Sequence, residues 1–120
     1  MEQKKKHFEK LLKRSISHII HNKVKDPRIG FVTITRINLS DDLHNAKVYI
    51  SVLGTKEEQQ KSMKGLSSAT NFVRSELAAS LKNYRSIPNI AFYYDQDLAK
   101  VYQLMDKVYS LENERKEQEG

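Results

Sequence analysis

The sequence contains no cysteine, and it has only four glycines and two prolines in 120 residues. The absence of cysteine excludes disulfides, thiolate catalysis and cysteine zinc sites, and it is compatible with a reducing cytoplasm. Neither a Walker loop nor a dinucleotide fingerprint is present, and so few glycines do not predict a phosphate-cradling loop. No apolar run approaches the about 20 residues of a transmembrane helix. No apolar segment follows the basic N-terminus, so a secretory signal is not predicted.

Positive charge is concentrated in the first third of the chain. Residues 1–36 carry ten Lys or Arg and three Asp or Glu, a balance of +7, whereas residues 37–120 balance at −1. A one-sided positive field favours a polyanionic partner, because phosphate binding releases counterions. A solvated lysine-rich helix that only aids solubility is the alternative, and charge alone leaves both open.

Helical periodicity occurs in three parts of the chain. Apolar residues at steps of three and four predict a helix over residues 4–23 with a basic outer face. A capping box begins a second helical stretch over 55–83. Weak helix formers cluster before Asn71, so we expect a bend or break there and hence two helices. A last amphipathic helix is predicted over 98–111.

Alternating and β-branched residues predict three strands, over 31–39, 46–53 and 90–94, and the first two form an antiparallel hairpin. The predicted core contains Phe8, Ile16, Ile19, Val48, Ile50, Val52, Leu77 and Leu81. The apolar spacing of the second helical stretch also includes Phe72. We therefore predict an α+β fold in which helices cover one face of a three-stranded sheet. Tyr49 and Tyr93 would lie on the open face, either packed across strands or available to stack on bases.

The helix–strand–strand–helix–helix–strand–helix order predicts one domain over residues 4–111. Residues 112–120 are charged and contain no apolar residue, so this tail is expected to be disordered.

Candidate catalytic chemistry is sparse. His18 and His21 are three residues apart on a helix, but no third ligand lies near them in sequence, so they are interpreted as polar-face residues and no metal site is predicted. Asp41 and Asp42 are typical of a turn. Asp95 and Asp97 are placed to begin the last helix. The sequence does not predict an enzyme.

The segment Lys-Asp-Pro-Arg-Ile-Gly-Phe-Val-Thr-Ile-Thr at 25–35 joins the basic helix to the first strand. Asp-Pro favours a turn, and Gly30 can take backbone angles closed to other residues. The turn presents Lys25 and Arg28 to solvent beside the basic helix. It therefore either contacts a polyanion or chiefly sets the angle between helix and sheet.

Together with residues 39–54 and 69–77, this segment resembles the ribosome-binding factor A family, bacterial assembly factors of the small ribosomal subunit. The resemblance extends from about Phe8 to Met105. It implies a type II KH-like fold of order α-β-β-α-kink-α-β-α. The family has Ala-x-Gly at the kink, where this sequence has Ala69-Thr70-Asn71.

The resemblance also implies a cytoplasmic, non-catalytic protein that binds the 30S subunit and 16S rRNA during late maturation and 5′-end processing, often with a role in growth in the cold. No cofactor, metal, membrane or small-molecule substrate is expected, and a monomer is the default. The alternatives are a generic KH-like RNA-binding regulator that is not specific to ribosomes, and an adaptor that binds an acidic protein.

Six residues are predicted to contact RNA: Lys23, Lys25, Arg28, Lys64, Asn71 and Arg74. The cations would bind phosphates at the opening turn and on either side of the helix bend. Asn71 would either bond RNA or only shape the bend. Arg74 would alternatively pair with a carboxylate such as Glu76 or Asp95.

Overall fold

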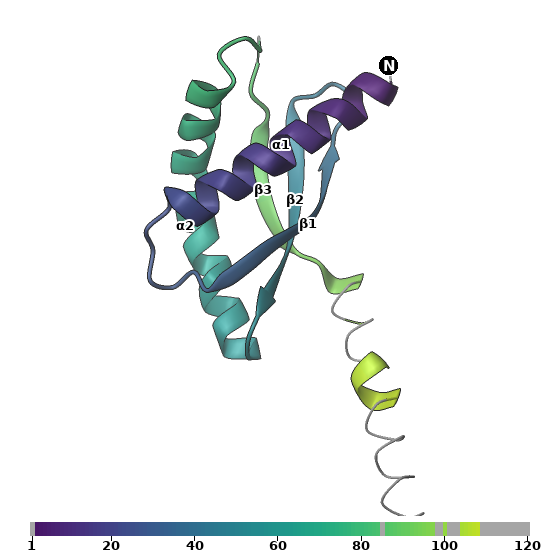
Figure 1. Cartoon of the computed structure of the whole chain (residues 1–120), viewed down its shortest axis with the longest axis vertical. Helices are drawn as coiled ribbons and strands as arrows, with labels where there is room; N and C mark the ends of the chain where they lie inside the picture. Colours follow the sequence, from purple (N-terminus) through teal and green to yellow (C-terminus); the bar gives the residue numbers. More distant parts are fainter. Residues whose placement is uncertain (1, 85, 98–99, 101–103, 109–120) are drawn as a thin grey trace, which may run out of the picture.

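A computed structural model describes residues 2–84, 86–97, 100 and 104–108. The elements are α1 (Glu2–Asn22), β1 (Phe31–Leu39), β2 (Asn45–Leu53), α2 (Lys56–Ser80) and β3 (Asn89–Tyr94). They occur in the predicted order, except that the single helix α2 stands where two helices were expected (Figure 1). Residues 96–97, 100 and 104–108 are helical, and the remainder of the predicted last helix and the whole tail lie outside the described residues.

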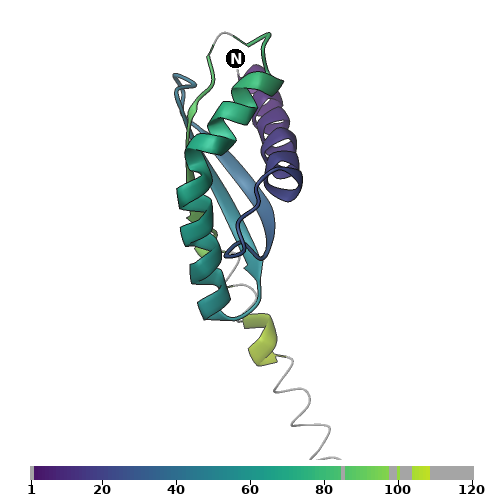
Figure 2. The same cartoon turned by 90° about the vertical axis from the view of Figure 1, so that its left-hand side faces the viewer.

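The three strands form one sheet in the order β1-β2-β3. β1 and β2 pair antiparallel, as the short loop between them predicts, whereas β2 and β3 pair parallel. Parallel neighbours need a long crossover, and α2 supplies it. Both helices lie on the same side of the sheet (Figure 2). The predicted α+β architecture with one helix-covered face is confirmed.

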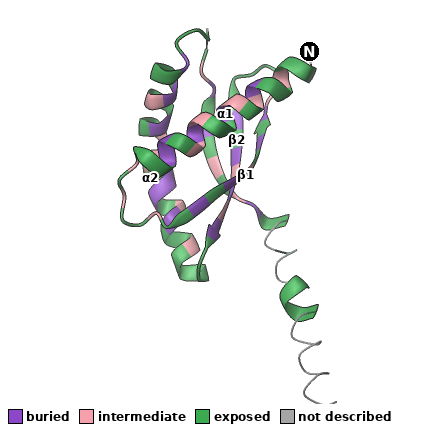
Figure 3. Ribbon diagram, viewed as in Figure 1, coloured by how far each residue is buried: buried purple, intermediate pink, exposed green. Residues whose placement is uncertain are grey.

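The core lies between the helices and the inward face of the sheet (Figure 3). All eight residues predicted for the core are buried, and Ile16, Val48, Ile50 and Leu77 are fully enclosed. The apolar side chains of α1, which recur with the helical period, therefore face the apolar side chains that alternate along the strands, and the two sets enclose one core.

A bulge interrupts the register of β1 between Ile34 and Arg36. Strict alternation from Phe31 would turn Ile37 outward, but the extra residue Thr35 shifts the pattern, so that Ile37 is buried. The same shift places Arg36 on the open face. The sequence alone contains no sign of this bulge.

The expected division of the second helical stretch into two helices is wrong. α2 is one unbroken helix from Lys56 to Ser80, and the predicted capping box at Thr55 and Glu58 is present at its start. The kink takes the form of a change in the direction of the helix axis (Figure 2). The Thr70 hydroxyl donates to the Leu66 carbonyl at 3.1 Å, a contact that often bends helices without breaking them. The only non-glycine residue with positive φ in the described ranges is Leu43, so Asn71 keeps ordinary helical angles.

Candidate nucleic-acid interface

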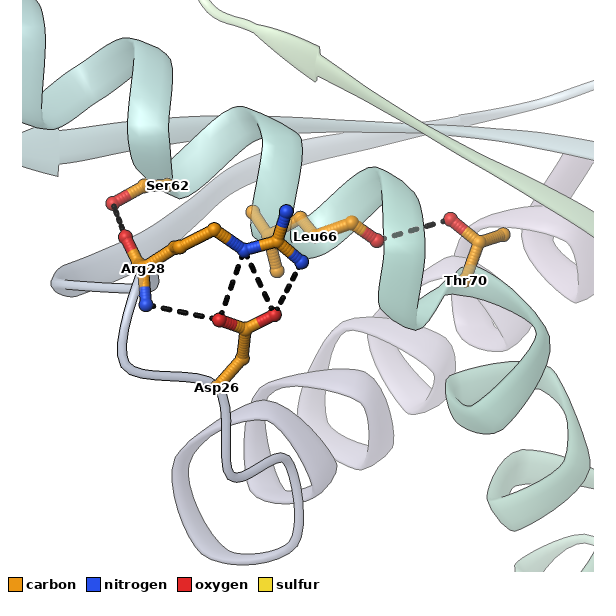
Figure 4. Close-up of polar contacts among 5 residues, drawn as sticks. All are labelled: Asp26, Arg28, Ser62, Leu66 and Thr70. Atoms are coloured by element: carbon orange, nitrogen blue, oxygen red, sulfur yellow. Dashed lines mark hydrogen bonds and ion pairs between the residues drawn. The ribbon is translucent and has the colours of Figure 1, made fainter.

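The turn between α1 and β1 is held by a clamp between Asp26 and Arg28 (Figure 4). The backbone N–H of Arg28 donates to Asp26 Oδ1 at 2.9 Å, and Nη2 of the guanidinium donates to Oδ2 at 2.7 Å. Nε contacts both oxygens at 3.1 and 3.2 Å. The hydrogen bonds from Arg28 hold the pKa of Asp26 below its ordinary value, and they raise the pKa of Arg28. The charge of Arg28 is therefore compensated inside the turn.

The turn is also seated directly on α2. The buried Ser62 hydroxyl accepts from the Gly30 N–H at 2.9 Å and donates to the Arg28 carbonyl at 3.4 Å. A Cβ atom at Gly65 would lie 2.6 Å from Ile29 Cγ1, so only glycine allows this approach without movement. The glycine, which weakens a helix, is explained by its contact with the turn.

Two of the predicted lysines lie at the junction of the turn and α2. Lys23 forms an ion pair with Glu76 at 2.9 Å. Lys25 is exposed and has no ion pair within the described part of the chain. Both line a shallow hollow of about 220 Å³ together with Ser68, Ala69 and Phe72. The structure therefore brings the turn and the bend of α2 to one surface.

The other predicted residues lie on α2 itself. Lys64 and Asn71 are seven residues apart, two helical turns, and therefore lie on one exposed stripe. Lys64 also lacks an ion pair with any described residue. The alternative for Arg74, an ion pair with a carboxylate, is not seen among the described residues. Its Nη2 instead donates to the Ile87 carbonyl at 3.4 Å, and with Asn71 it lines a separate hollow of about 470 Å³. Of the cations at the interface, Lys25 and Lys64 are the least constrained.

Phe72 is a residue of this surface that the sequence did not reveal. Its helical spacing suggested a core position, but 44% of the residue is exposed, whereas its neighbour Val73 is buried. Adjacent residues on a helix are about 100° apart, and here Val73 takes the core-facing side of α2 while Phe72 lies at its outer edge. Leu66, Val73 and Leu77 already form a complete buried stripe along α2. Their spacing in the sequence was the signal that could have placed Phe72 outside the core. An exposed ring beside Lys23 and Lys25 can stack on a base.

The clamp predicts a specific pH response. Because its folded-state pKa is depressed, the Asp26–Arg28 contact contributes stability above the unfolded pKa of about 3.9, and this contribution is lost as pH falls through the folded pKa. In a carboxyl NMR titration we expect Asp26 to titrate below its ordinary value, and Arg28→Ala to return it toward that value. Titration of wild-type Asp26 at its ordinary pKa would contradict the clamp.

The described residues contain no cluster of three His, Cys, Asp or Glu side chains able to hold a metal ion. His21 Nε2 contacts the Val32 carbonyl at 2.8 Å, and His18 contacts Asn22.

Asp42 has the turn role that was predicted for it. Its carboxylate accepts hydrogen bonds from the Ser40 hydroxyl and from the His44 N–H, and the Ser40 bond is the main reason that the pKa of Asp42 is lowered. No helix in the described ranges is long and apolar enough to cross a membrane.

The chain is similar to proteins of one known family. The family model described as "Ribosome-binding factor A" matches residues 4–108. The ribosome-binding factor A of Halothermothrix orenii is 40% identical over 119 residues, covering 97% of each chain. That of Natranaerobius thermophilus is 46% identical over 95 residues, covering 79% of this chain and 72% of the relative.

Solved structures agree with the sequence match. The crystal structure of ribosome-binding factor A from Thermus thermophilus superposes with a TM-score of 0.63 at 26% identity, covering 73% of this chain and 92% of that one. A homology model of the Thermus thermophilus factor, fitted into a cryo-EM map of its complex with the 30S subunit, gives a TM-score of 0.62 at 26% identity, covering 73% and 91%. With the KH-like arrangement of its sheet and helices, this chain belongs to the ribosome-binding factor A family.

Proposed function

We propose that this protein is a non-catalytic assembly factor that binds the small ribosomal subunit through 16S rRNA in the cytoplasm. The observation that carries the proposal is the family match over residues 4–108. It is supported by a structural relative that was placed in a complex with the 30S subunit. Binding to an immature subunit would hold one rRNA conformation and delay translation until late maturation and 5′-end processing are complete. A role in growth in the cold stays a prediction.

The proposed RNA surface is the junction of the turn with α2. Lys25 and Lys64 would bind phosphates directly, since neither has an ion pair with a described residue. Lys23 and Arg28 must exchange a carboxylate partner for phosphate, so each should contribute less. Asn71 and Arg74 would extend the contact along α2. The rigid turn supports such a surface because its shape is formed before RNA arrives.

A sucrose gradient of a cell lysate tests the proposal. We expect the protein to migrate with free small subunits and to be absent from translating ribosomes. The generic RNA-binding regulator would instead remain with smaller RNA near the top of the gradient. An adaptor complex with an acidic protein would survive RNase treatment, whereas the proposed complex would not. Migration unaffected by removal of small subunits would contradict the proposed function.

A further inference from the structure

The open face of the sheet carries a row of planar side chains that crosses all three strands. Arg36, Tyr49 and Tyr93 are direct cross-strand partners in the register of β1, β2 and β3. The guanidinium carbon of Arg36 lies 4.1 Å from the centroid of the Tyr49 ring, and the rings of Tyr49 and Tyr93 are 5.8 Å apart, tilted by 33°. The three groups therefore form one continuous stacked row.

The row remains accessible in the described structure. Tyr93 is 44% exposed, and the Arg36 side chain is 53% exposed. α1 and α2 both lie on the opposite face (Figure 2). A further aromatic residue, Phe31, stands 70% exposed on the same face, at the start of β1.

The row is held in place by carboxylates on one side and has a cation on the other. Asp95, which is buried and accepts from the Thr35 hydroxyl at 2.6 Å, lies 3.9 Å from Arg36 Nε, and Asp97 lies 3.7 Å from Nη2. Lys47 Nζ stands 5.8 Å from the Tyr93 centroid and has no ion pair within the described ranges. The two carboxylates thus hold the planar guanidinium of Arg36 beside the Tyr49 ring, while the ammonium group of Lys47 remains available to an anion.

We infer that this face is a second RNA-binding surface, which stacks unpaired bases on the Arg36–Tyr49–Tyr93 row and places a phosphate beside Lys47. Aromatic and guanidinium planes bind splayed-out bases of single-stranded RNA irrespective of sequence. An acidic peptide fits less well, because Asp95 and Asp97 lie at one end of the row. The inference rests on the proposed function only in that the protein meets ribosomal RNA.

A single-stranded hexa-adenylate RNA tests the inference with the full-length protein. In an NMR titration, we expect the largest shifts at the ring signals of Tyr49 and Tyr93 and at Arg36 Nε. Shifts confined to Phe72 and Lys25 would overturn it, because the RNA would then use the turn–α2 surface alone. This measurement uses only the wild-type protein, so it does not depend on any variant folding.

Fluorescence anisotropy with the same labelled RNA adds an energetic test. Tyr93→Leu is expected to weaken binding about tenfold, equivalent to about 1.4 kcal/mol, whereas Tyr93→Phe retains the ring and the affinity. Tyr84→Leu is the matched control, since Tyr84 is 42% exposed but stacks on Phe8 away from the row. Equal affinity of wild type and Tyr93→Leu, or equally weakened binding by both leucine variants, would overturn the inference.

The experiments distinguish a failure of the inferred second RNA-binding surface from a failure of the proposed function. If hexa-adenylate shifts the tyrosine row but the protein does not sediment with small subunits, the inference holds and the proposed function fails. If the protein sediments with subunits and hexa-adenylate leaves the row unchanged, the inference fails alone. If Tyr93→Leu abolishes binding to a partner that wild type retains after RNase treatment, the face docks a protein and the inference is overturned.

Discussion

The double variant Lys25→Glu/Lys64→Glu is expected to bind the small ribosomal subunit about 100-fold more weakly than wild type, taking about 1.4 kcal/mol for each site. Neither lysine has an ion pair with a described residue, so reversing its charge removes a phosphate contact and adds repulsion. The salt dependence should also become shallower, by about one unit of logarithmic slope for each phosphate that is no longer bound. Both quantities come from affinity measurements on purified subunits over a range of salt concentrations.

A matched variant separates a local contact from net charge. Lys82→Glu/Lys107→Glu makes the same change in total charge at two exposed residues away from the turn–α2 surface. Its affinity should fall much less than that of the first pair. If both double variants show the same decrease in affinity and in salt slope, the protein is attracted by its overall charge and the proposed surface is wrong.

Substitution of Gly65 by valine is expected to lower the free energy of unfolding by about 2 kcal/mol, a typical cost of overpacking. The new Cβ would lie 2.6 Å from Ile29 Cγ1 and 3.4 Å from Arg28 Cβ, so the turn must move away from α2. Displacing the turn would also separate Lys25 from the helix and weaken subunit binding. Urea unfolding and subunit affinity measure the two effects independently.

Ser67→Val is the control for this substitution. Ser67 is exposed two residues further along α2, so valine there should change stability by no more than about 0.5 kcal/mol. A Gly65→Val protein as stable as wild type would show that the turn does not need close contact with the helix. Preserved stability with weakened binding would instead place the effect at the RNA surface alone.

Much of the fold could be predicted because it depends on local and periodic signals. The steps of three and four in α1, the alternation in β2 and the capping box at Thr55 each specify their own element. The bend expected near Asn71 is present, but the helix does not divide into two, because burial of Leu66, Val73 and Leu77 on one stripe favours a continuous helix. Tertiary packing outweighed weak helix propensity there.

The candidate site was predictable in location but not in electrostatics. The distribution of Lys and Arg along the sequence placed the positive charge in the first third of the chain, and the Asp-Pro turn lies near the end of that basic segment. Which cations are uncompensated depends on partners distant in sequence, such as Glu76 beside Lys23. The exposure of Phe72 likewise depends on which side of α2 meets the sheet.

By itself, the sequence determined the element order apart from the undivided α2, together with the core, the turn at Asp26-Pro27 and the absence of cysteine chemistry, because these follow from residue type and spacing along the chain. The tertiary structure decided how those parts meet. Only the fold seats the turn on Gly65, pairs Lys23 with Glu76 and, through the bulge at Thr35, aligns Arg36 with two tyrosines. These contacts join residues far apart in sequence, and their register is set by packing of the whole sheet against two helices.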